Sequence, residues 1–239
     1  MDHVHKQIRE LLEAESDHEC EGFGQQHVCL RVVALAELPS RFGHFHVAAF
    51  SDTHDGKEHA AILKGFPWHA EDVPVRLHSE CLTGDAIGSL RCDCRDQLEH
   101  ALQLIGGLEH GVLLYLRQEG RGIGLTNKIR AYELQDTGLD TVQANEALGF
   151  QDDERNYSIA AHMLHSLHVH SVRLITNNPR KIAGLEELGV KVTGRIPLVI
   201  PPNDYNQAYL RTKAEKSGHL LGDTQEHQLH EQHDTSIFE

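Results

Sequence analysis

The sequence lacks three features that each define a class of proteins. No apolar run approaches membrane-spanning length, and the first residues lack the basic and apolar segments of a secretory signal. An excess of positive charge is also missing: the 239 residues carry a net charge of −14 at neutral pH, whereas a general nucleic-acid binder presents a basic face. We therefore expect a cytoplasmic protein without membrane or nucleic-acid partners.

Cysteine is scarce, yet three of the five cysteines lie close together, as Cys81, Cys92 and Cys94. Such clustering fits a reducing compartment, and a pair separated by one residue cannot close a normal disulfide with itself. Three thiolates suit a tetrahedral Zn²⁺ whose fourth position holds water, as in catalytic sites. With His78 as a fourth ligand the site would be closed and structural. The residues alone favour zinc over buried thiols and leave both kinds of zinc site open.

A second group of residues could hold an anion, which the overall negative charge would otherwise repel. An apolar strand at 112–116 precedes a glycine-rich turn and a helix, the layout that presents backbone N–H groups to a phosphate. Arg117, Arg121, Lys128 and Arg130 add four positive charges to this element. The spacing matches neither a P-loop nor the dinucleotide fingerprint, and a solvated helix face explains these residues equally well.

A third group follows the apolar run at 172–176. Thr176 ends the expected strand, Pro179 begins the next helix and Lys181 lies in its first turn. Ligands of α/β sheets bind outside the carboxyl ends of the strands, so Lys181 is expected to face the same crevice as the glycine-rich turn. Asp153-Glu154-Arg155 lies between two helices, on a loop that could close over the crevice, although a capping acid beside an exposed ion pair also explains it.

The hydrophobic pattern predicts an α/β fold. Helical spacing indicates a short amphipathic helix at 3–15, three β-rich runs follow, and strands then alternate with helices. We expect a mainly parallel or mixed sheet covered by helices on both faces, in three layers, with a β-rich N-terminal part. The expected strands are 27–37, 44–51, 59–63, 73–78, 112–116, 172–176 and 190–192, and the expected helices are 98–105, 125–136, 142–148, 158–167, 180–188 and 206–216.

These segments, taken together, resemble GTP cyclohydrolase II, the family that opens the guanine of GTP at the start of riboflavin synthesis. The resemblance covers about residues 28–221 in the family's order. It rests on Arg76-Leu-His-Ser-Glu-Cys-Leu-Thr-Gly-Asp, Leu90-Arg-Cys-Asp-Cys-Arg, Arg117-Gln-Glu-Gly-Arg-Gly-Ile-Gly-Leu, Asn127-Lys-Ile-Arg-Ala-Tyr, Asp153-Glu-Arg, Leu174-Ile-Thr-Asn-Asn-Pro and Thr212-Lys-Ala-Glu-Lys-Ser-Gly-His-Leu-Leu.

The resemblance implies a role for each matching residue. Cys81, Cys92 and Cys94 match the ligands of one catalytic Zn²⁺ per chain, which releases His78 from the metal. Asp153 matches the proton acceptor, Arg155 the nucleophile and Tyr132 a tyrosine of the active site. The positions that match GTP contacts are Arg76, Leu77, His78, Ser79, Glu80, Gln97, Glu119, Gly120, Arg121, Thr141, Thr176 and Lys181. The family also implies Mg²⁺ with the triphosphate and a homodimer.

The implied reaction is the zinc-dependent hydrolysis of GTP to formate, pyrophosphate and 2,5-diamino-6-(ribosylamino)-4(3H)-pyrimidinone 5′-phosphate. Two rivals remain: an enzyme that stops at the N-formylated ring-opened product, and a non-catalytic zinc-containing nucleotide-binding paralogue. Glu119 is a candidate acceptor for the guanine N–H groups. A nucleophilic Arg155 is hard to justify because a guanidinium is almost never deprotonated, so a purely electrostatic Arg155 is the alternative. Arg76, Arg91 and Arg95 flank the cysteines and could offset the charge of three thiolates.

The resemblance also divides the chain into three parts. Residues 1–22 are expected to be a helical N-terminal extension, and 23–221 the catalytic domain of a monofunctional enzyme. The tail at 222–239 contains acidic residues and histidines but no Lys or Arg. A second metal site there is imaginable, but this composition is typical of a disordered, solvated segment.

Overall fold

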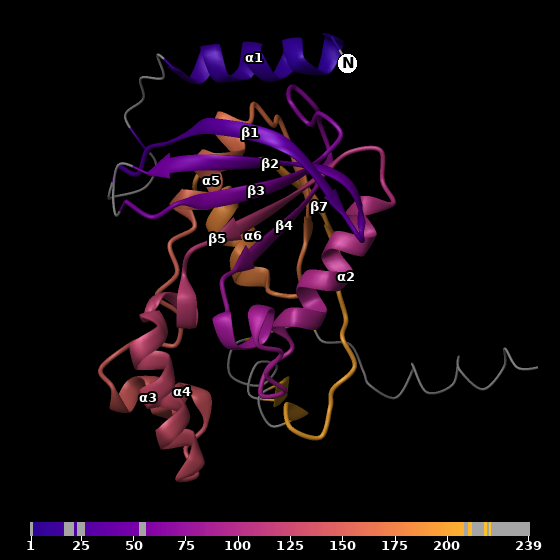
Figure 1. Cartoon of the computed structure of the whole chain (residues 1–239). Coiled ribbons are helices and arrows are strands. Elements are labelled where there is room, and N and C mark those ends of the chain that lie inside the picture. Colours follow the sequence, from indigo (N-terminus) through magenta and orange to yellow (C-terminus); the bar gives the residue numbers. More distant parts are fainter. Residues whose placement is uncertain are drawn as a thin grey trace, which may run out of the picture.

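The structure is a computed structural model that describes residues 2–16, 22, 27–52, 56–207, 210–211, 218 and 220. Within these residues one seven-stranded sheet has the order β1-β2-β3-β5-β4-β6-β7 (Figure 1). Its strands are β1 (Leu30–Ser40), β2 (Gly43–Asp52), β3 (His59–Lys64), β4 (Val73–Ser79), β5 (Gly111–Leu116), β6 (Val172–Ile175) and β7 (Val192–Ile196). The helices are α1 (Asp2–Ser16), α2 (Cys94–Gly106), α3 (Gly124–Asp136), α4 (Thr141–Ala147), α5 (Ser158–Ser166) and α6 (Pro179–Glu186), with short turns η1 (Leu82–Ala86) and η2 (Glu119–Gly122).

The sheet consists of an antiparallel half and a parallel half. β1, β2, β3 and β5 pair antiparallel to one another, and the first two form a hairpin that closes at the Ser40–Gly43 pair. β5, β4, β6 and β7 pair in parallel, which requires crossovers through helices. The carboxyl ends of β4, β5 and β6 therefore lie at the same edge of the sheet, where ligands of α/β proteins bind.

Each face of the sheet packs against its own helices, because alternate strand residues point to opposite faces. On β5, Val112 and Leu114 belong to the larger core cluster, which also contains side chains of α1, α5 and α6. Leu113 belongs to the smaller cluster, together with Ala101 and Ile105 of α2. Figure 1 shows α2 in front of the sheet, α5 and α6 behind it, and α1 beside β1. The predicted three-layer α/β architecture is confirmed, with a mixed sheet.

One expected strand is displaced from its predicted position. The strand expected at 190–192 begins only at Val192, because Val190 N–H donates to Leu185 O and so completes the end of α6 after Gly189 (φ 81°).

Two predictions concern residues beyond the described part of the chain. The tail at 222–239 lies outside it entirely, and the helix at 206–216 lies mostly outside it. The N-terminal helix is present as α1, and its Leu11 packs in the larger core cluster. Within the described residues, no helix is both long enough and apolar enough to cross a membrane.

Candidate active site

A cavity of about 500 Å³ opens at the carboxyl ends of β4, β5 and β6. This volume is within the range of small-molecule sites. Its lining comes from segments far apart in the sequence: the end of β4, the cysteine loop, α2, η2, α3, the start of α4, and the turn between β6 and α6. The three groups of residues that the sequence singles out therefore meet in one place.

The three cysteine sulfurs converge at one end of this cavity. Cys81 Sγ lies 3.8 Å from Cys92 Sγ, and all three sulfurs lie within 4.8 Å of one another. Thiolates bound to a tetrahedral Zn²⁺ at about 2.3 Å would be roughly 3.8 Å apart, so the spacing and the all-sulfur donor set fit zinc. Gly84 makes the convergence possible, since a Cβ at this position would lie 2.9 Å from Cys92 Sγ and 3.0 Å from Cys81 Sγ.

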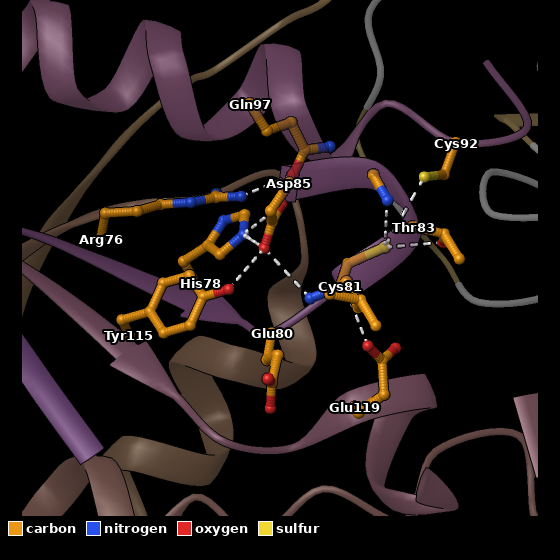
Figure 2. Close-up of polar contacts among 12 residues, drawn as sticks. Arg76, His78, Glu80, Cys81, Thr83, Asp85, Cys92, Gln97, Tyr115 and Glu119 are labelled. Carbon is orange, nitrogen blue, oxygen red and sulfur yellow. Dashed lines mark hydrogen bonds and ion pairs between the residues drawn. The ribbon is translucent and has the colours of Figure 1, made fainter. Parts of the chain in front are cut away.

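A buried carboxylate fixes the cysteine loop to the sheet (Figure 2). Asp85 accepts hydrogen bonds from the Cys81 backbone N–H (3.0 Å) and from the Tyr115 hydroxyl (2.9 Å), and His78 Nε2 lies 3.0 Å from it. Burial lowers the pKa of His78 below its ordinary value. His78 is thus directed to Asp85, and among the described residues the metal-ligating cluster consists of the three cysteines alone. The fourth position of a bound metal would be left for water or substrate.

The three thiols lie so close together that each one changes the pKa of the other two. Hydrogen bonds from Cys92 and Cys94 hold the pKa of Cys81 below its ordinary value, with a further contribution from the Lys128 charge. The hydrogen bond with Cys81 raises the pKa of Cys92 to about 11, and that of Cys94 also rises. The charge of Lys128 thus favours the thiolate form of Cys81.

Glu119 of η2 faces the cysteine loop. Its carboxylate accepts hydrogen bonds from Lys128 Nζ (2.7 Å), from the Leu82 backbone N–H (2.7 Å) and from the Gly120 backbone N–H (2.8 Å). A carboxylate has about four acceptor sites, so most of this capacity is used within the protein. That Glu119 also accepts from guanine stays a prediction.

The other end of the cavity is formed by the glycine-rich turn and the loop at 152–155. Gly120, Arg121 and Gly122 all have positive φ, at 63°, 59° and 99°. A Cβ on Gly122 would lie 2.9 Å from the Glu154 carbonyl oxygen, and the Glu154 N–H donates to Arg121 O. Arg121 also pairs with Asp152 at 2.5 Å. The left-handed turn thus lets η2 dock closely against the loop.

Asp153 and Arg155 form a bidentate ion pair on that loop. Arg155 Nε donates to Asp153 Oδ1 at 2.7 Å, and its terminal nitrogen donates to Oδ2 at 2.5 Å. Burial acts to raise the pKa of Asp153, but the Arg155 hydrogen bonds and charge lower it below the ordinary value. Arg155 lines the cavity and Asp153 lies behind it. Arg155 is therefore a charged hydrogen-bond donor at the cavity wall, and the Asp153 carboxylate holds it in place.

Most of the residues predicted for the site line the cavity; Leu77 and Asp153 do not. The Leu77 side chain packs in the larger core cluster, and only its carbonyl faces the site, where it accepts from Lys181 Nζ at 2.8 Å. Any Leu77 contact with substrate would thus be made by its backbone. The predicted residues that do line the cavity are Arg76, His78, Ser79, Glu80, Cys81, Cys92, Cys94, Gln97, Glu119, Gly120, Arg121, Tyr132, Thr141, Arg155, Thr176 and Lys181.

Comparison with known proteins decides the family. Residues 31–197 match the family model described as GTP cyclohydrolase II. The chain belongs to the GTP cyclohydrolase II family. It is 55% identical to the GTP cyclohydrolase-2 of Picrophilus torridus over 186 residues, which cover 78% of this chain and 96% of that protein. Identity to the GTP cyclohydrolase-2 of Azotobacter vinelandii is 57% over 190 residues, 80% of this chain and 91% of that one.

The family also includes longer proteins. The riboflavin biosynthesis protein RibBA of Synechocystis sp. is 58% identical over 189 residues, which cover 78% of this chain but 34% of that protein. The chain thus spans about a third of the length of this relative and nearly the whole length of the two GTP cyclohydrolase-2 relatives. The resemblance found in the sequence motifs is confirmed at the level of the family.

Three residues of this GTP cyclohydrolase II site were not singled out by sequence reasoning. Asp85 lies inside the cysteine motif, and its closeness to Cys81 in the sequence is the signal that could have identified it. Asp152, which pairs with both Arg121 and Arg180, directly precedes the Asp153-Glu-Arg motif. Tyr115 lies in an apolar strand and gave no indication, because its hydroxyl becomes relevant only when β4 and β5 pair.

Proposed function

We propose that this member of the GTP cyclohydrolase II family hydrolyses GTP to formate, pyrophosphate and 2,5-diamino-6-(ribosylamino)-4(3H)-pyrimidinone 5′-phosphate, as the first step of riboflavin biosynthesis. The observation that carries the proposal is that one cavity contains both a cluster of three converging sulfurs and a set of arginines and a lysine. A nucleotide has the same two-ended character, because its base and its phosphates are separated by the ribose.

At the sulfur end we propose one Zn²⁺ per chain, held by Cys81, Cys92 and Cys94. When bound, zinc supplies Lewis acidity that brings the pKa of a coordinated water toward neutrality, which is the chemistry that adding water to the guanine imidazole ring requires. Asp85 keeps the first ligand in place through its backbone N–H. Tyr132 lies beside the same loop, with its hydroxyl 3.4 Å from Thr83 Oγ1, and burial raises its pKa. It therefore acts as a protonated donor toward the substrate.

At the other end we propose that Arg121, Arg155 and Lys181 bind the triphosphate together with Mg²⁺. GTP carries about four negative charges, so charge-assisted hydrogen bonds from several cations are needed to hold it. Arg155 is proposed as a charged donor at the α-phosphorus, because a guanidinium paired with an ionised carboxylate remains protonated. Asp153 orients it through the bidentate contact. The remaining cavity residues named above are proposed GTP contacts.

The wider organisation of the chain is part of the same proposal. Residues 23–221 would form the catalytic domain, behind an N-terminal extension at 1–22 and before a tail at 222–239. The enzyme is placed in the cytoplasm, where reduced thiols persist. A homodimer is supported by exposed apolar side chains on the cysteine loop and on α3: Ile87, Leu90, Leu125 and Ile129.

The test is to incubate the zinc-loaded protein with GTP and Mg²⁺ and to measure formate, pyrophosphate and the pyrimidine product together. Equal amounts of all three support the proposal. Ring opening without free formate would indicate an enzyme that stops at the N-formylated product. GTP binding with none of the three products would indicate the non-catalytic paralogue.

A further inference from the structure

Lys128 is a buried cation of α3 whose ammonium group contacts the cysteine cluster. Its Nζ donates to Cys81 Sγ at 3.1 Å and to Glu119 Oε1 at 2.7 Å, and the residue is only 8% exposed. An ammonium group is costly to bury unless it is paired and hydrogen-bonded. Here the two anionic partners come from different segments, the loop after β4 and the turn after β5. Lys128 therefore joins both to α3.

The cysteine cluster needs a cation of this kind. Three thiolates around a divalent ion leave one net negative charge, which weakens the metal as a Lewis acid. The three arginines nearest to the cysteines in sequence donate their hydrogen bonds elsewhere. The partners are Ile175 O and Gln97 for Arg76, Asp136 for Arg91, and Glu99 for Arg95. Among the described residues, the cation that donates a hydrogen bond to a cysteine sulfur is Lys128.

The contacts around Lys128 close into a ring. Lys128 Nζ donates to Cys81 Sγ and to one oxygen of Glu119, and the other oxygen accepts from the N–H of Leu82, the residue after Cys81. Figure 2 shows the Glu119 carboxylate pointing toward the backbone beside Cys81. A ring of this kind fixes the direction from which the ammonium group approaches the sulfur, so the contact between Lys128 and Cys81 has a defined geometry.

We propose that Lys128 is a positioning residue that acts through Cys81: its charge and its N–H···S hydrogen bond offset one thiolate and set the electron donation of the cluster to the metal. The proposal rests on the proposed function, because it requires a metal at the three cysteines. Groups of this kind around metal ligands typically change metal affinity by about 10–100-fold when they are removed. Lys128 is thus assigned to the zinc end of the cavity, separate from the phosphate-binding cations.

The experiment compares Lys128→Met, Lys128→Arg and a control, Arg130→Met. Arg130 lies on the same helix, is exposed and donates to Asn127 within that helix. Each protein is titrated with zinc against a chelator, then loaded with Co²⁺ for its sulfur-to-cobalt charge-transfer band. We expect Lys128→Met to lose roughly 10–100-fold in zinc affinity, because the ring of contacts that holds Cys81 in place is opened. Its cobalt band should move to lower energy, because a thiolate without its donor gives up electrons more readily. Lys128→Arg should restore most of both values, and Arg130→Met should match the unmodified protein.

Other results would overturn the inference. A loss of stability in Lys128→Met with unchanged zinc affinity and an unchanged cobalt band would mean that Lys128 supports only the fold; urea unfolding of the metal-free proteins measures that stability. Equal band shifts in Lys128→Met and Arg130→Met would contradict a specific contact with Cys81. Neither result affects the zinc site itself, which fails only if the cysteines bind no zinc in the unmodified protein.

Discussion

The two ends of the cavity hold their charges in different ways. At the sulfur end, the negative groups come from one short loop and are met by one buried lysine and by backbone N–H groups. At the arginine end, three arginines are paired with two carboxylates of the loop between α4 and α5: Arg121 and Arg180 with Asp152, and Arg155 with Asp153. The arrangement of the sulfur end is thus suited to a cation, and that of the arginine end is suited to an anion.

This difference teaches what each end requires from the fold. The three cysteines lie within one short segment, 81–94, and their convergence needs mainly a local backbone shape, which Gly84 and Asp85 provide. The arginine end needs η2, the 152–155 loop and the start of α6 to dock together, and the pairing carboxylates keep the arginines in place before substrate arrives. A bound phosphate would then share the arginines with these carboxylates or displace the carboxylates from them. The two ends should therefore fail independently when one residue is changed.

The largest effect is expected for Cys92→Ser. Zinc should be lost, since thiolate is the ligand that this site offers, and formate release should fall below detection. The arginine end does not depend on the cysteines, so slow release of pyrophosphate should persist. Metal analysis and separate assays of the two products check this, with circular dichroism as the control for folding. Full zinc occupancy with intact activity in this variant would contradict the assignment.

The next largest effect is expected for Arg155→Ala. Removing one charged donor that stabilises developing negative charge typically lowers a rate by about 10²–10³-fold, so pyrophosphate release should fall by that amount. Zinc content should be unchanged, because Arg155 and its bidentate partner Asp153 make up a separate ion pair. Arg155→Lys should recover part of the rate. If pyrophosphate release is unaffected in Arg155→Ala, the division of roles between the two ends is wrong.

The same difference explains how much the sequence could predict. The cluster of three cysteines, the strand–turn–helix element and the alternation of strands and helices follow from local spacing, and all of them appear in the structure. The three-layer sheet follows from hydrophobic periodicity. The cysteines of the sulfur end are thus recognisable from the sequence because they lie close together in the chain.

Contacts between distant segments could not be predicted in this way. Lys128 appeared as one of four charges on a helix, and only the packing of α3 against the cysteine loop shows that it meets a sulfur. Asp152 pairs with arginines from two other segments. The displacement of the strand at 190–192 has a local cause instead, because Val190 completes the end of α6 after Gly189 and pairing with β6 begins at Val192.

A smaller effect, on binding, is expected for Arg121→Met and Lys181→Met. Each should weaken the binding of GTP by about 1.5–3 kcal/mol, which is the contribution of a hydrogen bond to a charged group. Guanosine lacks the phosphates and should bind almost as before. Calorimetry with both ligands measures the difference, and Arg130→Met serves as a charge control on the exposed face of α3. Equal losses for GTP and guanosine would show that these residues act through the fold.

Gly84→Ala should act on the sulfur end alone. The added Cβ would lie 2.9 Å from Cys92 Sγ and 3.0 Å from Cys81 Sγ, so the sulfurs must move apart and zinc affinity should fall by roughly 10–100-fold. GTP binding to the arginine end should change little. Gly194→Ala is the matched control, since a Cβ there meets no atom within 4 Å. Unchanged zinc affinity in Gly84→Ala would mean that the loop adapts without cost.

The smallest effect concerns the pH dependence of stability at the arginine end. The pKa of Asp153 is below its ordinary value, so the ion pair stabilises the native state above about pH 4, and this contribution is lost as the pH falls through the native pKa. In Arg155→Ala the side-chain hydrogen bonds and the charge of Arg155 are gone, so the pKa of Asp153 should rise. Burial, the backbone N–H of residue 155 and the Arg121 charge still act on the carboxylate.

Loss of the ion pair then destabilises this variant by about 1–3 kcal/mol at neutral pH, and protonation of Asp153 narrows the difference from the unmodified protein. The stability difference between the two proteins should thus be largest near pH 7 and should narrow as the pH falls below about 5. Urea unfolding at a series of pH values, in a Cys92→Ser background that removes the zinc contribution, measures this difference. Arg130→Ala, which changes an exposed arginine, should give a difference that does not vary with pH. A constant difference for Arg155→Ala as well would show that Asp153 is not held by Arg155, and the arginine end would then lack the preformed pairing that sets it apart from the sulfur end.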